Sequence, residues 1–151
     1  MTNETTMDKL REMRLTALAE AFRSQLTDSS FSALSFEERL GLLVDIEWSS
    51  RKSHRLQRLL RSANLDQNHA CIADIDYNPG RRLNRAEILR LANCTYIDEA
   101  HNIIILGATG TGKSYLACAF GVAACQKFKS VKYVRLPDLL VELAIARNEG
   151  I

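Results

Sequence analysis

The sequence lacks any apolar run long enough to span a membrane, and its N-terminus is polar and of mixed charge, unlike a signal peptide. These absences argue against a membrane protein and against a secreted protein, so we expect a cytoplasmic protein. A large net charge is missing too: the formal value is +2, which says little about partners. The length, 151 residues, is that of one domain, and 46% hydrophobic and 25% charged residues indicate a globular chain rather than a disordered one.

Patterns typical of metal sites and disulfides are missing as well. No two cysteines stand in C-x-x-C spacing, and no histidine has a companion ligand at metal spacing. Cys118 and Cys125 are seven residues apart, on one face of a predicted helix that is rich in alanine. We therefore predict buried, reduced thiols and propose no metal site on cysteine or histidine.

One segment does carry recognisable chemistry, because eight residues satisfy the phosphate-binding pattern G-x-x-x-x-G-K-[ST]. They are Gly107, Ala108, Thr109, Gly110, Thr111, Gly112, Lys113 and Ser114. Glycines let successive backbone N–H groups turn inward around phosphate oxygens, and a helix N-terminus adds partial positive charge behind them. We predict that Lys113 reaches the β- and γ-phosphates of ATP and that the Ser114 hydroxyl ligates Mg²⁺.

The sequence on either side of this segment favours the same interpretation. The four branched apolar residues 103–106 predict a buried parallel strand over 102–106 before the first glycine, and residues 115–126 predict an apolar helix after the loop. A second strand is predicted at 131–135, and a further helix starts at Pro137. This βαβα order predicts an α/β fold class, namely the start of a P-loop domain with a parallel sheet.

The N-terminal third of the sequence has helical periodicity. Apolar residues recur on one face over residues 7–26, which predicts a single helix. Ser35 and Glu38 form a capping box at the start of a longer helix. That helix either continues to about Ala63 or bends at residues 49–50.

These elements predict three consecutive parts of the chain. Residues 1–65 form a helical N-terminal module that binds DNA or a partner. Residues 66–101 form a connector with a helix that Asn84 caps. Residues 102–151 form the N-terminal part of a P-loop ATPase domain.

The second half of the long predicted helix is basic on one side. No acidic residue occurs between residues 51 and 62, and spacings of three and four place several of the basic side chains on one face. Such a face can contact DNA phosphates, and the alternative is a solvated helix surface. The candidate DNA contacts are Arg51, Lys52, Arg55, Arg58 and Arg61.

The residues Asp98–His101 spell D-E-A-H, the acidic box of a helicase family. An acidic box belongs at the end of a strand parallel to the phosphate-loop strand, and a parallel neighbour needs a crossover of about a dozen residues or more. Here the four residues lead straight into the predicted strand at 102–106. We therefore interpret them as solvated residues before that strand.

Several segments together resemble the IstB-like ATP-binding proteins, the helper ATPases of insertion-sequence transposition that are related to DnaC-type helicase loaders. The residues that carry the resemblance are 36–45, 74–77, the phosphate loop with 115–119, and 133–137. The resemblance covers about three quarters of the chain. It implies an AAA+ ATPase domain behind a helical module, binding ATP and Mg²⁺ and working as a homo-oligomer on DNA beside a transposase.

The chain also departs from that family pattern. The family continues with a strand that ends in paired acidic residues (Walker B), a polar sensor and a trans-acting arginine, and none is recognisable after Lys113. We therefore expect a C-terminally truncated member whose hydrolysis is impaired, and no catalytic residue is identifiable. The sheet order implied by the resemblance leaves a gap between the two predicted strands, so we expect a marginal or aggregation-prone product.

Two other functions stay open beside the transposition helper. A DnaC-like helicase loader in DNA replication has the same phosphate loop and is not separated from it by that motif. A non-enzymatic remnant or interaction fragment would use only the helical module. A small-molecule kinase ranks last, because no lid or cluster of substrate-binding arginines follows the loop.

Overall fold

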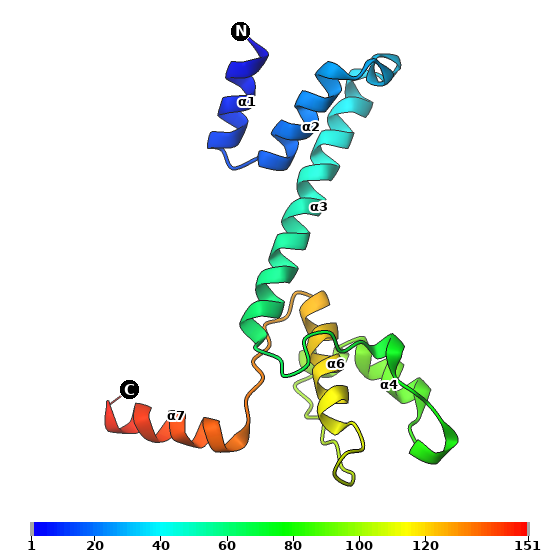
Figure 1. Cartoon of the computed structure of the whole chain (residues 1–151), viewed down its shortest axis with the longest axis vertical. Helices are drawn as coiled ribbons and strands as arrows, with labels where there is room; N and C mark the ends of the chain where they lie inside the picture. The colour runs from blue at the N-terminus through cyan, green and yellow to red at the C-terminus, as the bar shows by residue number, and fades with distance from the viewer. Residues whose placement is uncertain (1, 151) are drawn as a thin grey trace. The chain divides into compact units, whose positions relative to one another are not determined.

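The structure, a computed structural model, describes residues 2–150, and helices dominate it (Figure 1). The chain divides into two compact units, Met1–Arg55 and Leu56–Ile151, each with its own internal packing. No helix in the described part of the chain is long and apolar enough to cross a membrane.

The first unit contains α1 (Asn3–Glu12), α2 (Thr16–Thr27), the short 3₁₀ helix η1 (Ser29–Ala33) and the first part of α3 (Phe36–Ala63). The prediction of one helix over residues 7–26 is wrong, because the chain reverses at Arg14, whose φ is 60°. The N–H groups of Arg14 and Leu15 donate to carbonyls of the last turn of α1, both at 2.8 Å, in the pattern of a Schellman helix end. The turn lets α1 pack against α2 and bury Met7 and Ala19.

The predicted capping box at the start of α3 is confirmed. The backbone N–H of Ser35 donates to the Glu38 carboxylate (2.7 Å), and the N–H of Glu38 donates to the Ser35 hydroxyl (3.2 Å). From this start, α3 continues without interruption to Ala63, which settles the two predicted alternatives in favour of the continuous helix.

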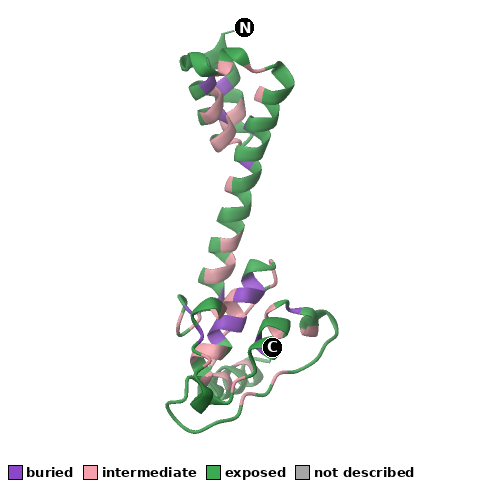
Figure 2. Ribbon diagram, turned by 90° about the vertical axis from the view of Figure 1, so that its right-hand side faces the viewer, coloured by how far each residue is buried: buried purple, intermediate pink, exposed green. Residues whose placement is uncertain are grey.

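The second unit is organised around α6 (Lys113–Gln126), the helix that carries most of its buried side chains (Figure 2). Both α4 (Arg85–Ala92) and η2 (Ile72–Asp74) pack against α6. As predicted, the Asn84 side chain caps α4, accepting from the N–H groups of Ala86 (3.0 Å) and Glu87 (3.3 Å). The unit also contains η3 (Pro79–Arg81), α5 (Thr95–Asp98) and α7 (Leu136–Asn148).

The small residues of α6 explain how the unit packs. The buried positions form a run of mostly small side chains, so neighbouring segments can approach the helix axis closely. Two of these positions are the cysteines that were predicted to be buried, and burial raises the pKa of the Cys125 thiol. The buried residues of α6 are Cys118, Ala119, Phe120, Ala123, Ala124 and Cys125.

The predicted α/β fold with a parallel sheet is wrong, because residues 2–150 contain no β-strand and are mostly helical. The segment 102–106 is irregular. Ile103 and Ile105 are half-buried, whereas Ile104 and Leu106 are 80% and 87% exposed. The alternation of a strand is present in this segment, but no second backbone pairs with it within the described chain.

The second predicted strand, at 131–135, is also irregular. A backbone hydrogen bond runs from its Tyr133 N–H to the carbonyl of Ala63 (2.8 Å), at the end of α3. A helix end therefore lies where a parallel sheet would place a neighbouring strand. The side chains of Val131 and Tyr133 still pack against buried residues of α6.

Candidate nucleotide-binding site

The phosphate-loop residues form a tight, exposed turn that leads into α6. Gly110 and Gly112 have φ values of +79° and +91°, a left-handed conformation that glycine adopts without strain. At Gly107 the limit is space, because a Cβ atom there would lie 3.1 Å from the Thr111 hydroxyl oxygen. The loop therefore favours glycine at Gly110 and Gly112 for their backbone conformation, and at Gly107 a side chain would require the Thr111 hydroxyl to shift.

Gly112 is also the N-cap residue of α6, so Lys113 and Ser114 begin the helix. The N–H groups of a first helical turn have no acceptor within their own helix. Together with the partial positive charge of the helix end, they favour an anion at this position. Ser114 is exposed at this end, and its role as a ligand of Mg²⁺ stays a prediction.

The loop is closed on itself by two side chains. The Lys113 ammonium donates to the carbonyl oxygen of Ala108 at 2.6 Å, and the Thr111 hydroxyl donates to the same oxygen at 2.8 Å. Both bonds are exposed, and the lysine stem folds over the turn. A phosphate group that attracts the ammonium must therefore compete with one carbonyl oxygen, and the neutral acceptor is the weaker partner of the two.

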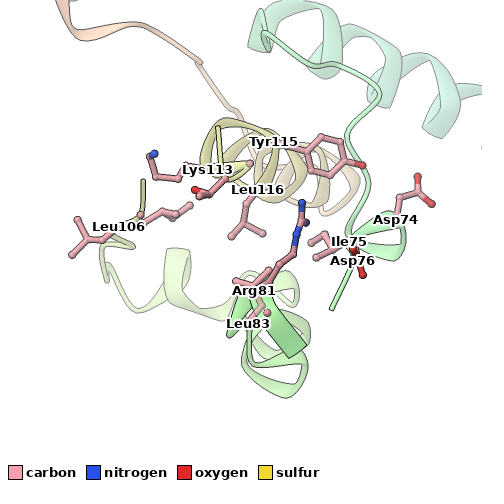
Figure 3. Close-up of a pocket in the computed structure, with 14 residues that line it drawn as sticks. Asp74, Ile75, Asp76, Arg81, Leu83, Leu106, Lys113, Tyr115 and Leu116 are labelled. Atoms are coloured by element: carbon pink, nitrogen blue, oxygen red, sulfur yellow. The ribbon is translucent and has the colours of Figure 1, made fainter. Parts of the chain in front are cut away.

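A cavity of about 630 Å³ adjoins the loop, which is in the size range of small-molecule sites. One side is formed by the loop and the first turn of α6, and the other by residues 74–83 (Figure 3). The second side contributes Asp74, Asp76 and Arg81 together with apolar residues, and the Arg81 side chain extends toward Leu116 (Figure 3). Sequence reasoning did not find these lining residues; its only signal was the family resemblance at 74–77.

The D-E-A-H segment takes no part in this cavity. Asp98 is ion-paired with Lys129, and the Glu99 carboxylate lies 3.2 Å from Nδ1 of His101. Both carboxylate side chains are more than half exposed. The interpretation as solvated residues therefore agrees with their position, whereas the strand that was expected to follow them is absent from the described residues.

The candidate DNA-contact residues of α3 are not equivalent. Arg51 donates to the Glu47 carboxylate (2.8 Å) and to the carbonyl of Arg14 (3.2 Å), so its guanidinium holds the turn between α1 and α2. Lys52 lies over the exposed ring of Trp48, with its ammonium 5.0 Å from the ring centre. Arg58 and Arg61 continue along the same helix and are exposed.

The comparisons with known proteins agree on one family. The sequence model of the IstB-like ATP binding protein family matches residues 8–151. A protein of Pseudomonas fluorescens, named for ATP binding and for insertion sequence IS1162, is 41% identical over 150 residues, 99% of this chain and 65% of that protein. The insertion-sequence protein y4pL of Sinorhizobium fredii (strain NBRC 101917 / NGR234), also named for ATP binding, is 43% identical over 145 residues, 96% of this chain and 59% of that protein.

A more distant relative carries the same kind of name. The corresponding protein of insertion sequence IS21 from Pseudomonas aeruginosa is 27% identical over 142 residues, 93% of this chain and 53% of that protein. The chain thus spans roughly three fifths of the length of the curated relatives it matches.

Proposed function

The chain belongs to the IstB-like ATP binding protein family, and on that premise we propose that it binds ATP with Mg²⁺ at Gly107–Ser114 and serves an insertion sequence as a helper of transposition. In this role it acts in the cytoplasm on DNA beside a transposase, as part of a homo-oligomer. The insertion-sequence names of the relatives favour this function over helicase loading.

The observation that carries the ATP-binding part is the position of the loop. Its glycines bend the backbone at the N-terminus of α6, next to a cavity large enough for a nucleotide. The lysine and the backbone N–H groups supply positive charge at the loop, and the cavity extends away from it toward residues 74–83. A phosphate chain at the loop therefore has room beside it for the remainder of a nucleotide.

Each loop residue has a definite task in this proposal. Lys113 would exchange its bond to the Ala108 carbonyl for the β- and γ-phosphate oxygens, and the first-turn N–H groups of α6 would donate to the same chain. The Ser114 hydroxyl would hold Mg²⁺, which neutralises phosphate charge when it is bound. The proposal covers binding; hydrolysis is not part of it.

The DNA-binding part is proposed for the exposed basic side chains of α3. Arg51 is left out of this set, because its guanidinium is engaged with Glu47 and Arg14. The remaining residues carry positive charge on a helix surface where acidic neighbours are missing from residue 51 to residue 62. They are Lys52, Arg55, Arg58 and Arg61.

Binding of a fluorescent ATP analogue in the presence of Mg²⁺ tests the proposal. We expect Lys113→Ala to raise the Kd at least about tenfold, because a charge-assisted hydrogen bond of about 1.5–3 kcal/mol is lost. Lys127→Ala is the matched control: it removes the same charge at the exposed C-terminal end of α6. Equal affinities of the wild type and Lys113→Ala, with unchanged circular dichroism, would contradict the proposed site.

A further inference from the structure

The two sides of the cavity come from parts of the sequence that are far apart. Contacts between these parts must therefore fix the distance between the two sides. The loop side is fixed by α6. The opposite side, residues 74–83, contains the last residue of η2, the short helix η3 and irregular backbone. We call this segment the acidic wall, after Asp74 and Asp76.

Tyr115 connects the acidic wall to the phosphate loop. It stands two residues after Lys113 in the first turn of α6, and its side chain points across the cavity toward the chain that leads to Asp74 (Figure 3). Its hydroxyl accepts from the N–H of Cys71 (3.2 Å) and lies 3.4 Å from the carbonyl oxygen of the same residue, to which it donates. One phenol thus satisfies both backbone groups of Cys71.

The ring of Tyr115 adds apolar contacts on both sides of this bond. It packs against the cluster of Ala70 and Cys118, and also against the cluster of Ile75 and Phe120. Ile75, at 9% exposure, anchors the acidic wall to the core from within. The hydroxyl bond to Cys71 adds a polar contact between the start of α6 and the chain just before the wall.

The chemistry of the acidic wall differs from that of the loop. Asp74 and Asp76 bring two carboxylates, whereas Arg81 and Arg82 bring two guanidinium groups, so the wall has no net charge but supplies acceptors that the loop lacks. Asp76 is oriented locally, because its carboxylate accepts from the N–H of Asn78 (3.0 Å). Carboxylates repel phosphates and accept hydrogen bonds from amino and hydroxyl groups, which a nucleoside has and a bare phosphate chain lacks.

We propose that Tyr115 is a positioning residue that fixes the acidic wall relative to the phosphate loop, so that the site binds a nucleoside triphosphate more tightly than the bare triphosphate chain. This inference rests on the proposed ATP-binding function and names the residue that joins its two halves. The loop recognises the phosphates by charge, and the wall contributes affinity only while its acceptors stay at a fixed distance from the loop.

The test compares ATP with inorganic tripolyphosphate, both with Mg²⁺, by calorimetric titration of the wild type, Tyr115→Phe and Lys113→Ala. Tyr115→Phe keeps the ring and its packing and removes only the hydroxyl. We expect its Kd for ATP to rise about fivefold while its Kd for tripolyphosphate stays within about twofold, as one hydrogen bond of ordinary strength is lost. Lys113→Ala should weaken both ligands.

Tyr133→Phe is the matched control, because Tyr133 packs on the same Ala70 cluster but does not line the cavity. Its ratio of ATP to tripolyphosphate affinity should equal that of the wild type. Amide hydrogen exchange gives a second measurement that needs no ligand: Tyr115→Phe should speed exchange at residues 71–76 and leave the second half of α6 unchanged.

The outcomes separate the two proposals. If the wild type fails to bind ATP, or if Lys113→Ala binds it equally well, the proposed function is overturned. If Lys113→Ala is defective but Tyr115→Phe keeps the wild-type ratio of the two affinities, only the role of Tyr115 is overturned. A purely structural role of the hydroxyl would lower the melting temperature and change both affinities by the same factor.

Discussion

Replacing Glu47 by alanine should destabilise the first unit more than any other change of a carboxylate in α3. Glu47 is 8% exposed and projects from α3 toward the start of α2. Its carboxylate accepts from the backbone N–H of Leu18 (3.0 Å) and from Nε of Arg51 (2.8 Å). Since α2 has no side-chain cap and no acidic residue in its first turn, Glu47 supplies from another helix the negative charge that this N-terminus needs.

The magnitude follows from these two bonds. A hydrogen bond from a backbone N–H to a carboxylate at a helix N-terminus contributes about 1.5–2 kcal/mol. The pair with Arg51 adds about 0.5 kcal/mol, because the arginine side chain is 56% exposed and solvent screens it. We therefore expect Glu47→Ala to lower the free energy of unfolding by about 2–2.5 kcal/mol, and Glu47→Gln, which keeps an acceptor oxygen, by about half as much.

Urea unfolding followed by far-UV circular dichroism measures this loss, and amide exchange at Leu18 locates it. The control is Asp45→Ala, an exposed carboxylate on the same helix, which should change stability by less than about 0.5 kcal/mol. The hydrogen bond from Arg51 lowers the pKa of Glu47 below its ordinary value of 4.5. Its contribution is therefore present above pH 4.5 and is lost as the pH falls through the lowered pKa. Equal stability of Glu47→Ala and Asp45→Ala at neutral pH would refute the capping role.

Two further predictions concern exposed residues. Ile104→Lys should reduce ANS fluorescence without lowering the melting temperature, because the isoleucine side chain is 80% exposed and contributes little packing. Unchanged ANS fluorescence would show that the dye does not bind at Ile104. Arg58→Ala should reduce the slope of log K against log salt for duplex DNA by about 0.9, the value for one phosphate contact. Arg51→Ala should instead lower the stability of the protein. If Arg58→Ala leaves the salt dependence of DNA binding unchanged, Arg58 does not contact DNA and this face of α3 is solvated.

Local chemistry explains which features of the fold were predictable. The caps at Ser35 and Asn84 depend on side chains within three residues of the helix start, so their sequence pattern contains the whole interaction. The break at Arg14 depends on contacts that lie far away in the sequence, since Glu47 and Arg51 hold the turn from α3. A periodicity rule applied to residues 7–26 alone cannot detect such partners.

The candidate site likewise has one part that local sequence predicts and one part that depends on long-range contacts. The turn before Lys113 was predictable from the sequence, because its left-handed positions at Gly110 and Gly112 favour glycine locally, whereas phosphate binding at this turn stays a prediction. The acidic wall was not, because nothing in the spacing of Asp74, Asp76 and Arg81 relates them to a loop that follows about thirty residues later. They reach the same cavity through long-range packing, in which Ile75 joins a cluster with Tyr115 and Phe120 of α6.

The missing sheet shows the limit of such rules most clearly. Residues 102–106 have the composition of a buried strand, and the alternation is visible in the structure, with Ile103 and Ile105 half-buried and Ile104 exposed. A strand, however, is defined by hydrogen bonds to a second backbone, and composition does not provide that backbone. Ile105 packs on the cluster that contains Phe120 of α6, and this contact on one side is enough to bury it while Ile104 stays exposed. Burial on one face can therefore produce the pattern of a strand in a segment that forms none, which is why the apolar run beside the loop predicted a sheet that the described residues lack.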